Sequence, residues 1–80
     1  MSKREELAEH VEEAIVWDGF DEAIIGYTDE VAVYDKDKMV EILMADGMTD
    51  EDAWDYLGFN VFCAYVGEKT PKHITLLWRE

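Results

Sequence analysis

The sequence predicts a small α+β domain, with helices packed on one face of a three-stranded, mainly antiparallel sheet. Three segments carry apolar residues at helical spacing, and three others are β-rich runs. They follow one another in the order α-β-β-α-α-β, which is typical of helices packed on a small sheet. Residues 1–80 are expected to form a single domain, because 49% of them are apolar and this suffices for a core.

The first segment is expected to be an amphipathic helix over roughly residues 3–17. Ser2 and Glu5 have the spacing of a capping box, in which two side chains satisfy backbone amides of the first turn. Asp18 and Gly19 mark its end, because glycine tolerates the left-handed conformation that terminates many helices. The apolar stripe of this helix consists of Leu7, Val11, Ala14 and Ile15.

Two β-rich runs follow and predict a hairpin. They are AIIGYT at residues 23–28 and VAVY at residues 31–34. Asp29 and Glu30 separate them, which is the length of a tight two-residue turn. The turn lacks the glycine that such loops prefer.

The acidic segment MADGMTDEDAWDYLGFN, residues 44–60, is open to interpretation as a cation-binding loop or as the junction of two helices. An EF-hand loop needs oxygen ligands and a glycine at fixed positions, and neither Asp35 nor Asp46 begins such a frame. The junction is favoured. Gly47 then ends a helix that Asp35 begins, and Thr49 caps the next helix, whose first acids complement the helix dipole. No metal site is expected.

The third helix is expected over roughly residues 50–66, and a closing strand at residues 73–79. Gly58 inside the helix suggests that another element crosses it closely. The helix stripe consists of Ala53, Leu57, Val61, Ala64 and Tyr65, widened by Trp54, Phe59 and Phe62. One side of the strand HITLLWR consists of Ile74, Leu76 and Trp78.

The net charge of −13 comes from 20 acidic and 7 basic residues. Residues 1–67 carry 18 acids and 4 bases, a net −14, whereas residues 68–80 carry 2 acids and 3 bases, a net +1. Such a surface repels nucleic acid and anionic lipid, so direct binding to nucleic acid or membrane is not expected. It attracts basic partners, although a face that only keeps the protein soluble gives the same pattern.

The location follows from three features of the sequence. No apolar stretch approaches the length of a membrane span, and residues 1–10 lack the apolar core of a signal peptide. Cys63 is the single cysteine, so no internal disulfide can form, which suits a reducing compartment. A cytoplasmic protein is therefore expected.

Nothing in the sequence predicts an enzyme, a cofactor or catalytic residues. His10 and His73 are the only histidines, and Cys63 lies in an apolar helix, where a buried cysteine usually behaves as a small hydrophobe. A core or a solvent position, with no catalytic role, is expected for each of the three. No phosphate-binding glycine loop, CxxC or HExxH motif is present. Asn60 is expected to be structural and to hold the loop at residues 67–71.

The residues expected to meet a partner combine carboxylates with an aromatic ring. An aromatic side chain rimmed by acids makes a good anchor, because aromatic residues dominate interface energetics. The rings of Trp17, Phe20, Trp54 and Trp78 are numerous for so small a core, so each is expected either to pack inside or to form such an anchor. The candidates are Glu9, Glu12, Glu13, Trp17, Asp18, Asp21, Glu22, Asp50, Glu51 and Asp55.

A pattern of short motifs runs through residues 31–71. It comprises an extended VAVYD segment, a helix ending in DGM, a Thr cap followed by acids, then FN and YVGEKTP. This pattern resembles a group of small proteins encoded by bacteriophages and prophages. The short turn TDE and the ending LLWRE depart from the group, and residues 1–20 lie outside the resemblance. The resemblance implies a phage-encoded accessory protein in a bacterial host cytoplasm, but no particular activity.

Two functions follow as hypotheses. The first is an accessory protein that binds or inhibits a host protein with a basic surface. A sharper version is a DNA mimic or anti-defence factor whose carboxylates stand in for phosphates. The alternative is a structural or assembly homo-oligomer, without a host target, that buries the surplus aromatic side chains.

Moderate NaCl should raise the melting temperature of this protein. Carboxylates crowded on a small surface repel one another, and salt screens that repulsion over about 8–10 Å. A salt series followed by circular dichroism measures the effect. A flat or falling response would show that the charges already compensate one another.

Overall fold

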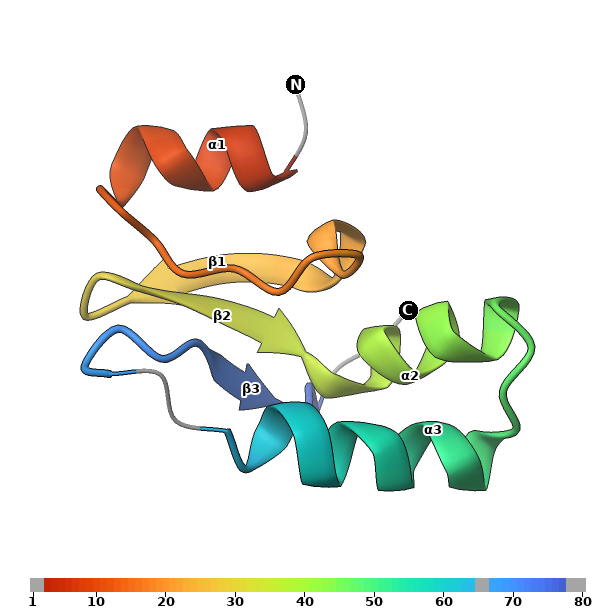
Figure 1. Cartoon of the computed structure of the whole chain (residues 1–80). Coiled ribbons are helices and arrows are strands. Elements are labelled where there is room, and N and C mark those ends of the chain that lie inside the picture. The colour runs from red at the N-terminus through yellow and green to blue at the C-terminus, as the bar shows by residue number, and fades with distance from the viewer. Residues whose placement is uncertain (1–2, 65–66, 78–80) are drawn as a thin grey trace.

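The computed structural model describes residues 3–64 and 67–77, and its elements follow the predicted order (Figure 1). They are α1 (Lys3–His10), β1 (Ile24–Thr28), β2 (Val31–Asp35), α2 (Lys36–Ala45), α3 (Asp50–Leu57) and β3 (Lys72–Ile74). A 3-10 turn (Asp21–Ala23) precedes β1, and a π-helical turn (Gly58–Phe62) extends α3. The α+β class and the α-β-β-α-α-β order are therefore confirmed.

The sheet is mixed, so the prediction of a mainly antiparallel sheet was wrong in this respect. Its strand order is β1-β2-β3, with β1 and β2 antiparallel and β2 and β3 parallel. Parallel neighbours need a long crossover, and residues 36–71, which contain α2 and α3, provide it. The order of elements along the chain is the same for either strand direction.

The hairpin forms as predicted, with a two-residue turn between Thr28 and Val31. Asp29 and Glu30 both have positive φ, at 49° and 64°, although neither is glycine. Two positive φ values are what a type I′ turn requires, and this turn matches the right-handed twist of the strands. The register shifts between Ile24 and Gly26, so a bulge interrupts the ladder near the start of β1.

β3 is shorter than the predicted strand at residues 73–79. Its last residue, Ile74, pairs with Asp35, the last residue of β2. The Asp35 carboxylate accepts hydrogen bonds from the backbone amides of Asp37 (3.0 Å) and Lys38 (3.4 Å), so it caps α2. Because the chain turns into α2 at this residue, the predicted continuation of β3 has no strand beside it. Trp78 and Arg79 lie outside the described residues.

α1 ends at His10, seven residues before the predicted end of the first helix at residue 17. Glu13 has a positive φ of 53°, which an α-helix cannot accommodate. The chain instead runs irregularly from Val11 to Phe20, and both of these residues are buried in the core. Tertiary burial therefore overrides the helical spacing. Ser2 of the predicted capping box lies outside the described residues.

The junction between α2 and α3 matches the prediction. Gly47 has a φ of 109° and its amide donates to the carbonyl of Met44, which ends α2. The Thr49 hydroxyl accepts from the amide of Asp52 at 3.2 Å and caps α3. Among the described residues, nothing comes within 4 Å of where a Cβ of Gly58 would lie, so the predicted close crossing is not seen in this part of the chain. The described helical segment ends at Phe62, short of residue 66.

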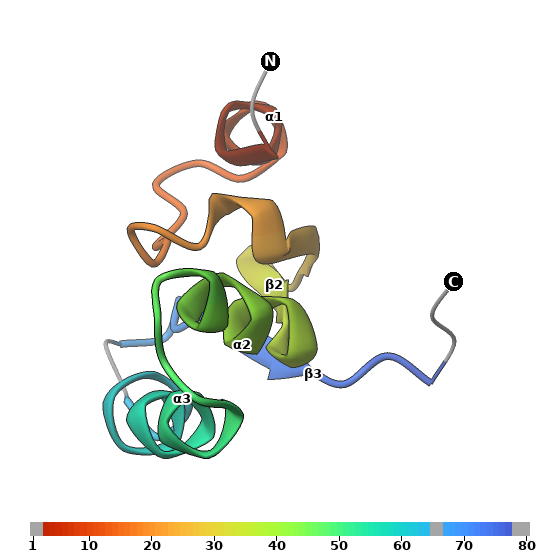
Figure 2. The same ribbon diagram turned by 90° about the vertical axis from the view of Figure 1, so that its right-hand side faces the viewer.

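All three helices contribute to one core on one face of the sheet. Tyr34, Met39 and Leu57 are its largest fully buried side chains. The segment after β3 runs away from α3 (Figure 2). The core consists of Leu7, Val11, Phe20, Ala23, Ile24, Ala32, Tyr34, Met39, Val40, Leu43, Ala53, Leu57 and Val61.

Replacing Glu30 by glycine should stabilise the protein by about 0.5–1 kcal/mol. A non-glycine residue in the left-handed region costs about 1–2 kcal/mol, and glycine removes this cost. The gain is smaller than the cost because glycine also gives the unfolded chain more conformational entropy. Glu30→Gln is the matched control, since it removes the charge but keeps the Cβ. Urea unfolding of the two variants measures the difference. Equal stability of the two variants would show that the turn is not strained.

Candidate functional site

The described part of α3 has one buried side and one exposed side. Ala53 and Leu57 are fully buried, and Val61 in the π-helical turn joins them in the core. These residues repeat every four positions and hold the helix against the rest of the domain. The other side faces away from the core.

That other side carries two aromatic rings beside two carboxylates. Tyr56 is 44% exposed and Phe59 is 84% exposed. Asp52 and Asp55 are exposed one turn before Tyr56 and Phe59, respectively. Cys63 is exposed one turn after Phe59. These five residues recur at intervals of three or four, so they share one side of the helical segment. We call this set, Asp52, Asp55, Tyr56, Phe59 and Cys63, the aromatic face of α3.

A π-helical turn underlies the end of this face. The Asn60 side-chain amide donates to the carbonyl of Tyr56 at 2.9 Å, inside the helical segment. Single π-helical turns are often found at functional sites because the extra residue re-aims the side chains around it. Here the turn spans Phe59, the more exposed of the two rings on the aromatic face.

Two sequence-based expectations about this region were wrong. Phe59 was expected to widen the buried stripe, but other residues of the helix fill the core and Phe59 is exposed. Asn60 was expected to hold the loop at residues 67–71, but it bonds within its own helix. That loop is closed instead by Thr70, whose hydroxyl donates to the carbonyl of Gly67 at 2.6 Å. Of the core and solvent positions left open for Cys63, the structure has the exposed one, at the end of the helical segment.

The predicted partner-binding residues lie on two separate parts of the molecule. Asp50, Glu51 and Asp55 are exposed on α3. The others come from α1 and the residues before β1, and Figure 1 shows α1 beside β1 and α3 beside β3, at the two ends of the strand order. In this second group Asp21 and Trp17 are partly buried, whereas the exposed members are Glu9, Glu12, Glu13, Asp18 and Glu22.

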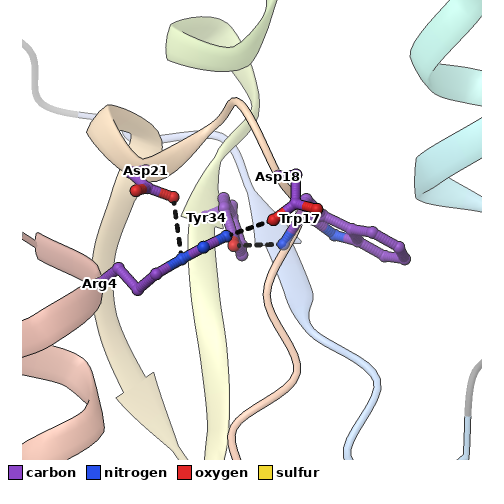
Figure 3. A network of polar contacts seen from close by, with 5 residues as sticks. All are labelled: Arg4, Trp17, Asp18, Asp21 and Tyr34. Atoms are coloured by element: carbon purple, nitrogen blue, oxygen red, sulfur yellow. Dashed lines mark hydrogen bonds and ion pairs between the residues drawn. The ribbon is translucent and has the colours of Figure 1, made fainter.

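Trp17 belongs to a network of polar contacts (Figure 3). Its backbone amide donates to the Tyr34 hydroxyl at 2.8 Å, and its indole Nε1–H donates to Nε2 of His73 at 2.8 Å. Arg4 on α1 contacts the carboxylates of Asp18 at 2.7 Å and Asp21 at 3.3 Å. This network ties α1, β2 and β3 to one short segment, so Trp17 is a structural residue here.

Several basic side chains are engaged within the protein. The Lys3 ammonium donates to the carbonyl of Glu22, and the Lys69 ammonium donates to the carbonyl of Glu12. Lys72 forms an ion pair with Asp29 at 3.3 Å. These contacts are at the surface and contribute little stability one by one. None of them involves an acid of the aromatic face of α3.

His73 is a half-buried, neutral acceptor. Partial burial and, to a lesser extent, the nearby charge of Lys36 together lower the pKa of His73 to about 4. Because an indole N–H can only donate, the bond to Trp17 requires an unprotonated Nε2. The rings of Tyr34 and Phe62 lie 5.8 and 5.1 Å from the His73 ring. The sequence placed His73 at the start of a strand but gave no sign of this contact.

Residues 3–64 and 67–77 contain neither a candidate metal site nor a candidate membrane-spanning helix. No three His, Cys, Asp or Glu side chains in these residues are arranged to hold an ion. No helix among them is long and apolar enough to cross a bilayer. Comparisons of the chain with family models, curated proteins and solved structures found no match.

The residues of the aromatic face could have been found from one signal in the sequence. Ala53, Leu57 and Val61 already supply one residue per turn to the core, which is enough to anchor a helix. Tyr56 and Phe59 lie outside that stripe in a helical projection. Counting both as core residues assigns more apolar surface to α3 than one side of a helix can bury.

Acidification from pH 6.5 to about 4 should destabilise the native protein through His73. The folded-state pKa of His73 is lowered to about 4 from 6.5, so the unfolded chain binds more protons in this range. The stabilising contribution is complete above pH 6.5 and is lost as the pH falls through the folded pKa. His73→Gln, which keeps an acceptor, should remove this contribution, as urea unfolding across the pH range would show.

The His73 ring signals give an independent measurement by NMR. A midpoint near pH 4 in the folded protein is expected. A midpoint at or above 6.5, or parallel pH curves for the native protein and His73→Gln, would contradict a half-buried neutral imidazole.

Proposed function

We propose that this protein is a small acidic accessory protein that acts by binding a basic partner protein through the aromatic face of α3. The observation that carries the proposal is the exposure of Phe59, 84% of whose surface meets solvent beside carboxylates. Monomeric proteins gain nothing in stability from a large apolar ring in that position. A partner that covers the Phe59 ring would bury its apolar surface, which stabilises the complex.

The charges on α3 favour a cationic partner. Asp50, Glu51 and Asp52 lie in the first turn, and Asp55 follows one turn later. A field of one sign raises the rate of encounter with a partner of the opposite sign. The aromatic rings then supply affinity, because buried aromatic anchors dominate the energy of most interfaces. The carboxylates that attract the partner and the rings that anchor it therefore lie on the same helical segment.

The biological setting rests on the sequence motifs in residues 31–71. Their resemblance to small phage and prophage proteins favours action in the cytoplasm of a bacterial host. In that setting the partner is a host protein with a basic surface, and the effect of binding is inhibition or redirection. Because nucleic-acid-binding proteins have such surfaces, mimicry of DNA and interference with host defence are the sharper forms of this proposal.

Phe59→Ala should weaken partner binding about tenfold or more, as expected for an aromatic anchor. It should change the free energy of unfolding by no more than about 0.5 kcal/mol, because the side chain is exposed. Capture from bacterial lysate, at low and at high salt, followed by titration with the retained protein, measures the effect. Retention should fall at high salt.

Leu77→Ala is the matched control, because Leu77 is 94% exposed and lies on the segment that leads away from α3. It should leave binding unchanged. If no basic protein is retained even at low salt, electrostatic capture is wrong. If Phe59→Ala and Leu77→Ala bind equally well, the aromatic face is not the site. Displacement of the partner by duplex DNA would support mimicry, and its absence would count against it.

A homo-oligomer is the second candidate, favoured by the number of exposed large apolar side chains. They include Ile25, Tyr27, Met44, Phe59 and Leu77. Association of identical chains would bury some of them without any other protein. Repulsion between chains that each carry a net charge of −13 opposes it. Light scattering at high concentration decides, because a monomer removes this candidate.

A further inference from the structure

We propose that the aromatic face of α3 selects arginine over lysine, so that the partner binds through an arginine-bearing segment whose guanidinium groups stack on Tyr56 and Phe59. This inference rests on the proposed function, because it names the chemistry of the partner at the same site. It follows from the position of a carboxylate one helical turn before each exposed ring.

Two ring–carboxylate pairs repeat along the aromatic face. Asp52 precedes Tyr56 by four positions, and Asp55 precedes Phe59 by four positions. Side chains four positions apart in a helix lie next to each other on the same side. All four side chains are exposed. Each ring therefore meets solvent with a carboxylate beside it.

The two carboxylates have no ion pair with a cation of the described residues. The ion pairs within residues 3–64 and 67–77 involve the carboxylates of Asp18, Asp21 and Asp29. Asp52 and Asp55 take no part in them. A cation that a partner brings to the aromatic face therefore meets carboxylates that these ion pairs do not neutralise.

A ring of the same helical segment already accepts a cation. The Lys36 ammonium lies 5.2 Å from the centre of the Phe62 ring. The Phe62 ring packs against Trp54 and His73 and is partly buried, so a residue of the protein itself can reach it. The Phe59 ring, three positions earlier, is exposed, and a cation of another molecule can occupy its face in the same way.

A guanidinium group fits this arrangement better than an ammonium group. It is planar, so its face can stack on a ring while the N–H groups along its edge donate two parallel hydrogen bonds to a carboxylate. The ammonium of lysine is compact and strongly hydrated, and it loses more of its hydration on approaching a ring. A side chain that satisfies the ring and the carboxylate of one pair at once is therefore arginine.

Two synthetic peptides of equal charge test this preference. Each is about six residues long and alternates serine with either arginine or lysine, so that the charged side chains share one side of an extended chain. Both are titrated into the full-length ¹⁵N-labelled protein. The arginine peptide should shift the amide signals of residues 52–63 and bind about three- to tenfold more tightly than the lysine peptide. The ratio of the two dissociation constants measures the selectivity separately from the attraction that both peptides share.

Three variants locate the source of the selectivity. Phe59→Leu keeps an apolar side chain but removes the ring, so it should lower the preference for arginine to about twofold or less. Asp55→Asn removes the charge but keeps the shape, so it should also lower the ratio. Asp50→Asn is the matched control, because Asp50 is on the same helix but on a different side, five positions before Asp55. It should weaken both peptides slightly and leave the ratio unchanged.

The outcomes separate this inference from the proposed function. Equal binding of the two peptides at α3 that still depends on Phe59 would overturn the selectivity for arginine and leave the proposed function standing. A preference that survives in Phe59→Leu, or that Asp50→Asn removes as fully as Asp55→Asn, would also overturn the selectivity. If neither peptide shifts the signals of α3, both the selectivity and the aromatic face as a binding site are wrong.

Discussion

The hydrogen bond between the Trp17 indole and the His73 imidazole connects parts of the fold that are far apart in the sequence. It joins the segment before β1 to β3, and the backbone of the same tryptophan bonds to Tyr34 on β2. Three segments that are distant in the sequence therefore meet at one residue. The contact needs a neutral imidazole, and burial provides that state by disfavouring the charged form. The contact holds β3, the parallel edge of the sheet, against the segment between α1 and β1.

The aromatic rings are divided between the core and the surface. Trp17 and Phe62 pack around His73 at the end of the core next to β3. The rest of the core is filled by aliphatic residues, Phe20 and Tyr34. Because so small a core has little room for more rings, Tyr56 and Phe59 remain outside. Their exposure results from a full core as well as from their positions on α3.

The sequence predicted those features of the fold that depend on residues close together in the chain. The caps at Asp35 and Thr49 and the stop at Gly47 were predicted because each depends on a few neighbouring residues. The hairpin was predicted from two runs separated by two residues. The end of α1 was missed because Val11 and Phe20 reach the core without helical backbone, and only distant contacts decide this. The direction of β3 was missed for the same reason.

The candidate site was predictable in part. The acids of α3 are visible in the sequence, but the position of Phe59 relative to the core depends on how much of the helix the sheet can cover. Trp17, a predicted anchor, proved to be held inside by two hydrogen bonds. Composition alone does not distinguish an aromatic ring that binds a partner from one that packs within the fold. Both kinds of ring are large, and both can have polar residues beside them in the sequence.

The parallel pairing of β2 and β3 has a kinetic consequence. Val33 pairs with Lys72, so this contact closes a loop that contains both α2 and α3. Loop-closure entropy must be overcome before such a distant contact contributes any stability, whereas the β1–β2 hairpin closes at once. We therefore expect the hairpin and the helix pair to form early, and the pairing of β3 with β2 to be the slow step of folding. Until then, β2 has an unprotected edge against which other chains in the cell can pair.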